Sequence, residues 1–196
     1  SVCQKGDTLI DYACGKAGDL PKWITAKLSF VFGIDIHLDN LENKLDGACA
    51  RFLNERRNNK IMPDALFVNG NSAFNIKSGQ ALLNDKAKEI THAIFGSGTK
   101  DEARLGKGVF RQYGKVESGF NVSSCQFALH YFLENNETLQ GFLRNLAECT
   151  KLNGYFIGTS YDGKLIFDEL KNKQKGDSIM IIEDKKKVWE ITKQYS

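Results

Sequence analysis

Two acids and a glycine-containing turn near the N-terminus have the types and spacing to bind an adenosine-type ligand. The segment Leu9–Trp23 reads LIDYACGKAGDLPKW, which predicts a buried strand, a turn and the start of a helix. In α/β proteins a nucleotide-like ligand lies at the carboxyl end of the first strand, against a helix N-terminus. Asp35 follows twenty residues after Gly15, at the end of the next apolar run, and an acid at that offset suits ribose hydroxyls.

The turn itself departs from the dinucleotide pattern G-x-G-x-x-G, in which glycines let the backbone approach a pyrophosphate. It reads ACGKAGD over residues 13–19 and lacks the first glycine of that pattern. The carboxylate of Asp19 suits the α-ammonium group of a methionine moiety better than it suits a pyrophosphate. The residues therefore favour S-adenosylmethionine over a dinucleotide. An acid at a helix start with no ligand is the alternative that the segment alone leaves open.

The elements that must position these acids alternate between apolar runs and helical patterns, which predicts a doubly wound, mostly parallel α/β sheet. The predicted strands are Thr8–Tyr12, Phe30–Ile36, Ala65–Asn69, Phe120–Cys125 and, after a turn at Asn153–Gly154, Tyr155–Thr159. The predicted helices are Leu20–Leu28, one helix from Leu38 to about Arg56–Asn59 with Leu41, Leu45, Ala48 and Phe52 on its apolar face, and one with Leu139, Phe142, Leu143 and Leu146 on one face. Ser178–Ser196 predicts a charged hairpin.

The segment Asn75–Gly119 separates the third and fourth predicted strands by more than a crossover needs. It contains a predicted helix, Gln80–Ile94, and a glycine-rich basic run. Eight Lys and Arg residues against five Asp and Glu residues leave a surplus of three positive charges. We favour a solvated surface insertion. Contact with an RNA backbone is the alternative.

The bulk composition describes an ordinary globular chain. With 196 residues, 41% hydrophobic residues and a net charge of +3, the chain can bury one sizeable core and does not by itself require a nucleic-acid partner. No apolar run is long enough to span a membrane, and no signal peptide is visible. We expect a piece of a longer polypeptide, because the first predicted strand begins almost at residue 1. Reduced thiols in a cytosolic setting are expected of the five scattered cysteines, Cys3, Cys14, Cys49, Cys125 and Cys149.

Three blocks closely resemble the signature motifs of the mRNA cap guanine-N7 methyltransferases. LIDYACGKAGDLPKW resembles their first motif, Ser124–Tyr131 (SCQFALHY) their second and Gly154–Gly163 (GYFIGTSYDG) their third, in the same order. The insertion and IDIHLDNLENKLDGACARFLNERR are most similar to the capping enzymes of large DNA viruses, of the African swine fever virus type. The resemblance implies a class I S-adenosylmethionine-dependent methyltransferase with a Rossmann-like fold, forming one domain over residues 1–196 with the insertion at 75–119.

The resemblance also implies roles for individual residues. Asp19 would face the methionine amino group, Asp35 would bind the ribose, and Tyr131 would separate the cofactor from the cap. The implied cofactor-binding residues are Ala13, Cys14, Gly15, Asp19, Asp35, Ile36, Asn71, Ser72, Gln126, Phe127 and Tyr131. The implied cap- and RNA-binding residues are Lys16, Lys22, Arg51, His130 and Tyr131.

Three positions depart from the family pattern. Ala13 and Ala17 replace glycines and narrow the turn by a methyl group each, and Asn71 replaces an acid near the adenine. An amide oxygen can still accept from the adenine amino group, but without charge assistance.

Plainer interpretations stand beside the implied roles. His130 could be a hydrogen-bonded histidine at a strand end, and Tyr131 could be a core side chain. Gln126 could cap the neighbouring helix. The three cations, Lys16, Lys22 and Arg51, could simply be solvated.

The implied reaction transfers a methyl group from S-adenosylmethionine to N7 of the cap guanine of viral mRNA. Guanine N7 is nucleophilic and carries no proton to remove, so we expect neither a general base nor a metal ion. Catalysis would come from in-line orientation, worth about 7–11 kcal/mol, with His130 and Tyr131 positioning the base.

The implied partners are the capped mRNA 5′ end (GpppN) and upstream triphosphatase and guanylyltransferase modules on the same polypeptide, with no membrane partner. The expected location is the viral factory of the host cytoplasm, with packaging in the virion as a second location. Two alternatives stay open, a non-catalytic stimulatory subunit of a capping complex and a class I methyltransferase acting on another RNA or small molecule.

Overall fold

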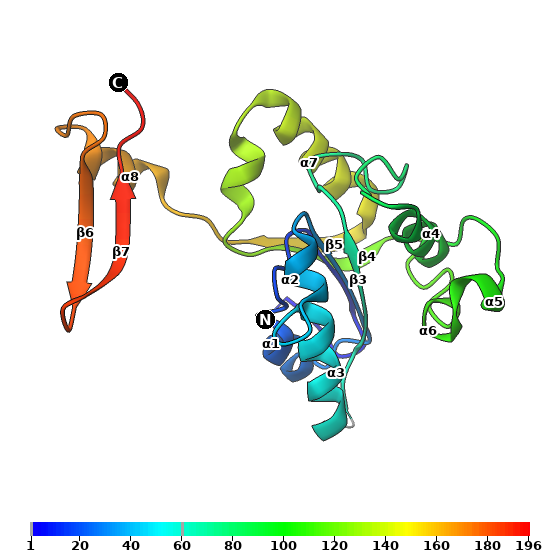
Figure 1. Ribbon diagram of the computed structural model, residues 1–196. Coiled ribbons are helices and arrows are strands. Elements are labelled where there is room, and N and C mark those ends of the chain that lie inside the picture. The colour runs from blue at the N-terminus through cyan, green and yellow to red at the C-terminus, as the bar shows by residue number, and fades with distance from the viewer. Residues whose placement is uncertain (1, 60) are drawn as a thin grey trace. The chain divides into compact units, whose positions relative to one another are not determined.

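A five-stranded parallel sheet carries the residues singled out above (Figure 1). The computed structural model describes residues 2–59 and 61–196. The strands lie in the order β3-β2-β1-β4-β5. Their bounds are β1 Thr8–Asp11, β2 Phe30–Asp35, β3 Asp64–Asn69, β4 Phe120–Cys125 and β5 Thr150–Gly158. This confirms the predicted doubly wound parallel sheet. The strand order reverses between β1 and β4, and ligands of open α/β sheets bind outside the carboxyl ends of strands at such a point.

Helices cover both faces of this sheet. The helices are α1 Leu20–Thr25, α2 Leu38–Glu42, α3 Ala48–Asn58, α4 Asp85–Ile94, α5 Glu102–Leu105, α6 Lys107–Phe110, α7 Asn136–Cys149 and the 3₁₀ helix η1 Leu129–Leu133. Trp23 of α1 and Phe52 of α3 pack with Val31 of β2, whereas Phe142 of α7 packs in the other cluster with Phe30 and Phe32. Consecutive side chains of β2 thus enter opposite layers, as the pleat of a strand requires.

The single helix predicted from Leu38 to about residue 59 is wrong, because the chain breaks into α2 and α3. Asn43 Oδ1 accepts from Leu45 N at 3.0 Å, which forms a side-chain turn that competes with the helix. A Cβ atom at Gly47 would lie 2.7 Å from the backbone of Asn43, so the glycine permits a tight connection. Leu45, predicted to lie on the apolar face, is consequently exposed.

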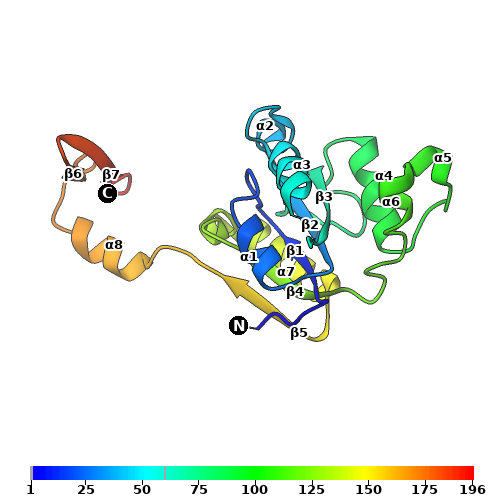
Figure 2. The same cartoon turned by 90° about the horizontal axis from the view of Figure 1, so that it is seen from below.

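The insertion at 75–119 folds into three helices, α4 to α6, which gather on the β3 side of the sheet (Figures 1 and 2). Its predicted helix begins at Asp85 rather than Gln80, because Asn84 is the N-cap and accepts from Ala87 N at 2.8 Å. Lys86 and Arg104 both pair with Glu89, and Lys88 pairs with Asp85. These ion pairs within the insertion absorb part of its positive charge.

The start of β5 and one residue of the apolar face of α7 also differ from the prediction. Strand β5 begins at Thr150 instead of Tyr155, with the predicted turn at Asn153 forming a bulge whose φ is 64°. Helix α7 has the predicted apolar face, since Phe142 is buried, but Leu143 is 46% exposed and lies off that face. Asn135 and Thr138 form a capping box that fixes the start of α7.

Residues Tyr161–Ser196 form a second compact unit. It contains α8, Gly163–Leu170, and the hairpin of β6, Ser178–Glu183, with β7, Lys186–Thr192, which confirms the predicted hairpin. The turn residues Asp184 and Lys185 both have positive φ angles, as a two-residue hairpin loop favours. The proposal of one domain over residues 1–196 stays a prediction. Across residues 2–59 and 61–196, no helix is both long and apolar enough to cross a bilayer.

Candidate functional site

A cleft of about 510 Å³ lies where the loops leave the carboxyl ends of β1 to β4. It brings together most of the cofactor residues implied by the sequence: Ala13, Asp35, Ile36, Asn71, Ser72, Gln126, Phe127 and Tyr131. The other lining residues were not predicted from the sequence: Tyr12, His37, Asn40, Gly70, Ala73, Ala128, Phe132, Glu134 and Thr138. The cleft is therefore assembled from four βα loops that are far apart in the sequence.

Asp35, at the end of β2, is the most highly connected acid of the cleft. Its Oδ2 atom accepts from Gly15 N at 2.8 Å, and its Oδ1 atom accepts from His37 N at 2.9 Å and from Asn40 Nδ2 at 3.0 Å. A carboxylate offers about four acceptor positions, so Oδ2 keeps one for a ligand hydroxyl. Asp35 thus holds the turn after β1 and has the capacity to bind a ribose.

The turn after β1 needs left-handed backbone at two residues. Gly15 has φ 53° and Ala17 has φ 55°. Glycine adopts this conformation without strain, whereas alanine does so at a cost of about 1–2 kcal/mol. The Cys14 side chain does not face the cleft, because it packs in the apolar layer with Trp23. The Cys14 N–H donates to Ile34 O, which ties the turn to β2.

Gly15→Ala is expected to lower the free energy of unfolding by about 1 kcal/mol, since a left-handed alanine is strained. An added Cβ at Gly15 would meet no atom within 4 Å, so the cost is conformational and not a clash. Urea denaturation measures it. Gly18→Ala is the matched control, because Gly18 also has free space and its φ is not positive. Equal stability of the two variants would contradict the explanation.

Two acids lie beside this turn, and one of them is buried. Asp11 ends β1 and is 2% exposed. Burial, reinforced by the negative charge of Asp19, raises the pKa of Asp11 to about 7. Asp19 is held by Lys22, whose Nζ lies 2.6 Å from its Oδ1. Asp11 is therefore partly protonated near pH 7, and the charge of Asp19 is balanced by Lys22, so the carboxylate of Asp19 is the group here that suits a cation. Asp11 was not predicted as a site residue, although its position as an acid at the end of a buried strand was visible in the sequence.

The loop after β4 presents Gln126 and Phe127 to the cleft. Gln126 bonds to Ser124 Oγ and accepts from Thr159 Oγ1, so its interpretation as a helix cap is wrong. Phe127 has φ 55° and is 68% exposed. Its N–H donates to the carbonyl and hydroxyl oxygens of Thr159, which hold this strained residue in place.

The loop after β3 forms the opposite wall. Ser72 is 3% exposed and donates its hydroxyl to Tyr12 O at 2.7 Å, so its side chain has a structural role. Asn71 Oδ1 accepts from Ala73 N at 3.0 Å and keeps its Nδ2 donors for other partners. The acid expected near the adenine is absent, and an amide faces the cleft in its place.

Helix η1 presents Tyr131 to the cleft. Phe132 anchors this helix by stacking on Phe142 with ring centroids 4.3 Å apart. Tyr131 is 68% exposed and lines the cleft, so its interpretation as a core side chain is wrong. His130 packs beside it, with ring centroids 4.2 Å apart, and is not among the lining residues.

The structure does not bring the three implied cap-binding cations into the cleft. Lys16 Nζ pairs with Asp46 at 2.8 Å and is partly buried, whereas Lys22 pairs with Asp19 but remains 75% exposed, as its interpretation as a solvated charge expects. Hydrogen bonding to Asp19 raises the pKa of Lys22. Arg51 is exposed on α3. None of the residues in these two ion pairs lines the cleft.

The described part of the chain contains no cluster of side chains that could bind a metal ion. Among residues 2–59 and 61–196, no three His, Cys, Asp or Glu side chains converge to hold a metal ion. The cysteines of this part are free thiols. Burial raises the pKa of Cys125 and Cys149 to about 12, so both thiols are poor nucleophiles.

Comparison with known proteins matches residues 3–193 to the mRNA (guanine-N(7))-methyltransferase domain. The chain is 31% identical over 177 residues to a "Probable mRNA-capping enzyme" of Acanthamoeba polyphaga mimivirus, covering 89% of this chain and 14% of that protein. It is 27% identical to mRNA cap guanine-N(7) methyltransferase 1 of Oryza sativa, covering 85% of this chain and 36% of that protein. Among solved structures, the YcgJ protein of Bacillus subtilis aligns with a TM-score of 0.50 and 14% identity, over 87% of this chain and 51% of that one. That likeness concerns the fold alone.

Proposed function

Because the chain belongs to the mRNA (guanine-N(7))-methyltransferase family, we propose that it binds S-adenosylmethionine and methylates N7 of the mRNA cap guanine. The chain spans 14% to 36% of the length of the curated relatives it matches. The activity is therefore proposed for this segment on the basis of the site that the segment itself contains. The fold is that of a class I methyltransferase.

The observation that carries the proposal is the placement of Asp35, Asn71, Gln126 and Tyr131 around one cleft at the strand switch point. The free acceptor position of Asp35 Oδ2 fits a ribose hydroxyl. Beside the turn after β1, Asp19 supplies a carboxylate of the kind that binds an α-ammonium group, and in the structure this carboxylate pairs with the Lys22 ammonium group. The residues present therefore fit S-adenosylmethionine.

Bound S-adenosylmethionine would supply an electrophilic methyl group on a sulfonium. Because N7 has no proton to lose, the protein needs no general base. Its task is to hold the guanine in line with that methyl group. Tyr131, exposed at the mouth of the cleft, is placed to orient the base, with His130 packed against its ring. Orientation alone can supply about 7–11 kcal/mol.

Labelled S-adenosylmethionine and GpppA-capped RNA test the proposal directly. Label on guanine N7 after nuclease digestion is the expected result, with m7GpppA-capped RNA as the blocked control. Calorimetry with the cofactor runs in parallel. Cofactor binding without methyl transfer would favour a stimulatory subunit, and label on another atom would favour a different acceptor. Either result overturns the proposed acceptor chemistry.

Tyr131→Ala is expected to lower kcat about tenfold while leaving the melting temperature unchanged, because the side chain is 68% exposed and contributes positioning. Tyr155→Ala is the matched control, since Tyr155 is 54% exposed on β5 and lies outside the cleft. An unaltered rate with capped RNA for Tyr131→Ala would reject the positioning role.

The partners and location are proposals of the same kind. We propose that triphosphatase and guanylyltransferase modules stand upstream on the same polypeptide, and that the protein acts in viral factories of the host cytoplasm and is packaged in the virion. The similarity to a viral protein of which this chain covers 14% supports the multi-module arrangement. Co-purification with guanylyltransferase activity from infected cells tests it.

A further inference from the structure

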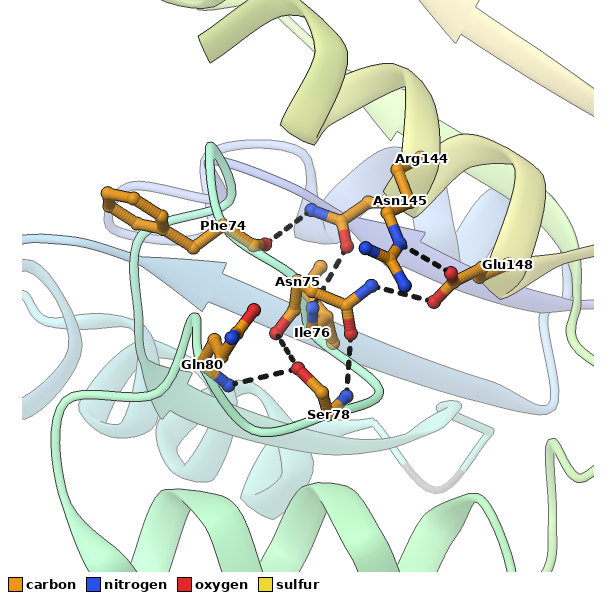
Figure 3. Close-up of polar contacts among 8 residues, drawn as sticks. All are labelled: Phe74, Asn75, Ile76, Ser78, Gln80, Arg144, Asn145 and Glu148. Carbon is orange, nitrogen blue, oxygen red and sulfur yellow. Dashed lines mark hydrogen bonds and ion pairs between the residues drawn. The ribbon is translucent and has the colours of Figure 1, made fainter. Parts of the chain in front are cut away.

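Helix α7 holds the loop after β3 through one buried amide (Figure 3). Asn145 is fully buried. Its Nδ2 atom donates to Ser72 O at 2.8 Å and to Phe74 O at 2.7 Å, and its Oδ1 atom accepts from Ile76 N at 2.9 Å. A single side chain thus satisfies three backbone groups of one irregular loop, which has no strand or helix to pair them.

One turn before Asn145, α7 lies close to the same loop at Gly141, which has no side chain. A Cβ atom at Gly141 would lie 1.8 Å from the carbonyl oxygen of Ala73. The glycine therefore sets the distance between helix and loop at this point, and Asn145 sets it one turn further on. The two contacts are independent, because one depends on hydrogen bonds and the other on the lack of a side chain.

An outer pair of contacts extends the clamp to the surface (Figure 3). Asn75 Nδ2 donates to Glu148 Oε2 at 2.7 Å, and Arg144 Nε donates to Glu148 Oε1 at 2.7 Å. These contacts are partly exposed, so the buried amide of Asn145 is the stronger constraint.

The clamped loop is a wall of the cleft on its other side. Asn71, Ser72 and Ala73 line the cleft, and two of them are held directly by α7, Ser72 by the Asn145 amide and Ala73 by the close approach at Gly141. We propose that Asn145, together with Gly141, is a positioning residue for cofactor binding: it fixes the loop wall against which the adenosine half of the cofactor packs. The inference rests on the proposed function, because it concerns the occupant of the same cleft.

Calorimetry tests the inference, with S-adenosylhomocysteine and with adenosine as the ligands. The measurements are made at a temperature where circular dichroism shows that each variant is folded. Asn145→Ala and Gly141→Ala are both expected to weaken the two ligands by the same factor, about tenfold, because small displacements of binding groups are costly. In the methyl transfer assay, KM for S-adenosylmethionine rises while kcat at saturating cofactor stays within twofold. Leu143→Ala, on the exposed side of α7, is the control with unchanged binding.

The outcomes separate the two ideas. If both variants fold and bind the ligands with wild-type affinity, and only their stability is reduced, the positioning role is overturned and the proposed function is unaffected. A wild-type protein that binds neither ligand overturns the proposed function and the inference with it. Hydrogen exchange provides a readout independent of ligands: the Ile76 amide should exchange faster in Asn145→Ala, and unchanged protection would contradict the clamp.

Discussion

Replacing Asp35 with asparagine is expected to weaken S-adenosylmethionine binding about 100-fold and to lower the free energy of unfolding by about 2 kcal/mol. The carboxylate accepts from three donors, two backbone N–H groups and the Asn40 amide. An asparagine amide keeps one oxygen, and its NH₂ group then faces a donor whichever way the side chain is turned. The charged acceptor offered to the ribose is lost as well.

Isothermal calorimetry gives the affinity of Asp35→Asn, and urea denaturation gives its stability. Asp39→Asn is the matched control, because Asp39 is an exposed acid four residues along the chain on α2. Wild-type affinity in Asp35→Asn would show that Asp35 holds only the turn and does not contact the cofactor.

Asp11 is expected to make the unliganded protein less stable as the pH rises. Its pKa is about 7 in the folded protein and about 4 in an exposed aspartate. Because the folded pKa is raised, stability is complete below pH 4 and is lost as the pH rises through 7. Between pH 5 and pH 8 the cost is about 3 kcal/mol. Asp11→Asn removes this cost, so its stability relative to the wild type should increase by that amount over this range.

Chemical denaturation of both proteins at half-unit pH steps measures the effect. Taking the difference between the two proteins cancels the titration of the other groups. Asp39→Asn again serves as the exposed control. A flat difference for Asp11→Asn would mean that Asp11 is ionised in the folded protein throughout this range.

The strands of the sheet could be predicted because buried parallel strands are short apolar runs, and only β5 was displaced. The break between α2 and α3 was not predicted, because the 3-and-4 spacing of Leu41, Leu45 and Ala48 persists across a turn that Asn43 and Gly47 impose. Local hydrogen bonding outweighed periodicity there. The start of α4 was misplaced for a similar reason, since Asn84 caps the helix.

Gln126 and Tyr131 could be predicted to lie at the site because they belong to a recognisable block, and Asp35 because it follows Gly15 by twenty residues at the end of an apolar run. Asn40 and Asn145 could not be found in this way, because their importance arises from contacts with residues distant in sequence or in another element. The cations near the turn show the opposite case. The family resemblance implies that Lys16 and Lys22 bind the cap, but the fold pairs each of them with an acid.

The backbone of Phe127 has a consequence for how this sequence can vary. A bulky side chain at φ 55° costs about 1–3 kcal/mol relative to glycine or asparagine, and this one is exposed at the cleft mouth and contributes little core packing. Selection for folding alone would therefore replace it. Variants selected only for thermal stability should replace Phe127 with glycine or asparagine, whereas variants selected for turnover should keep it. The residue found at position 127 therefore shows whether selection acted on stability or on activity.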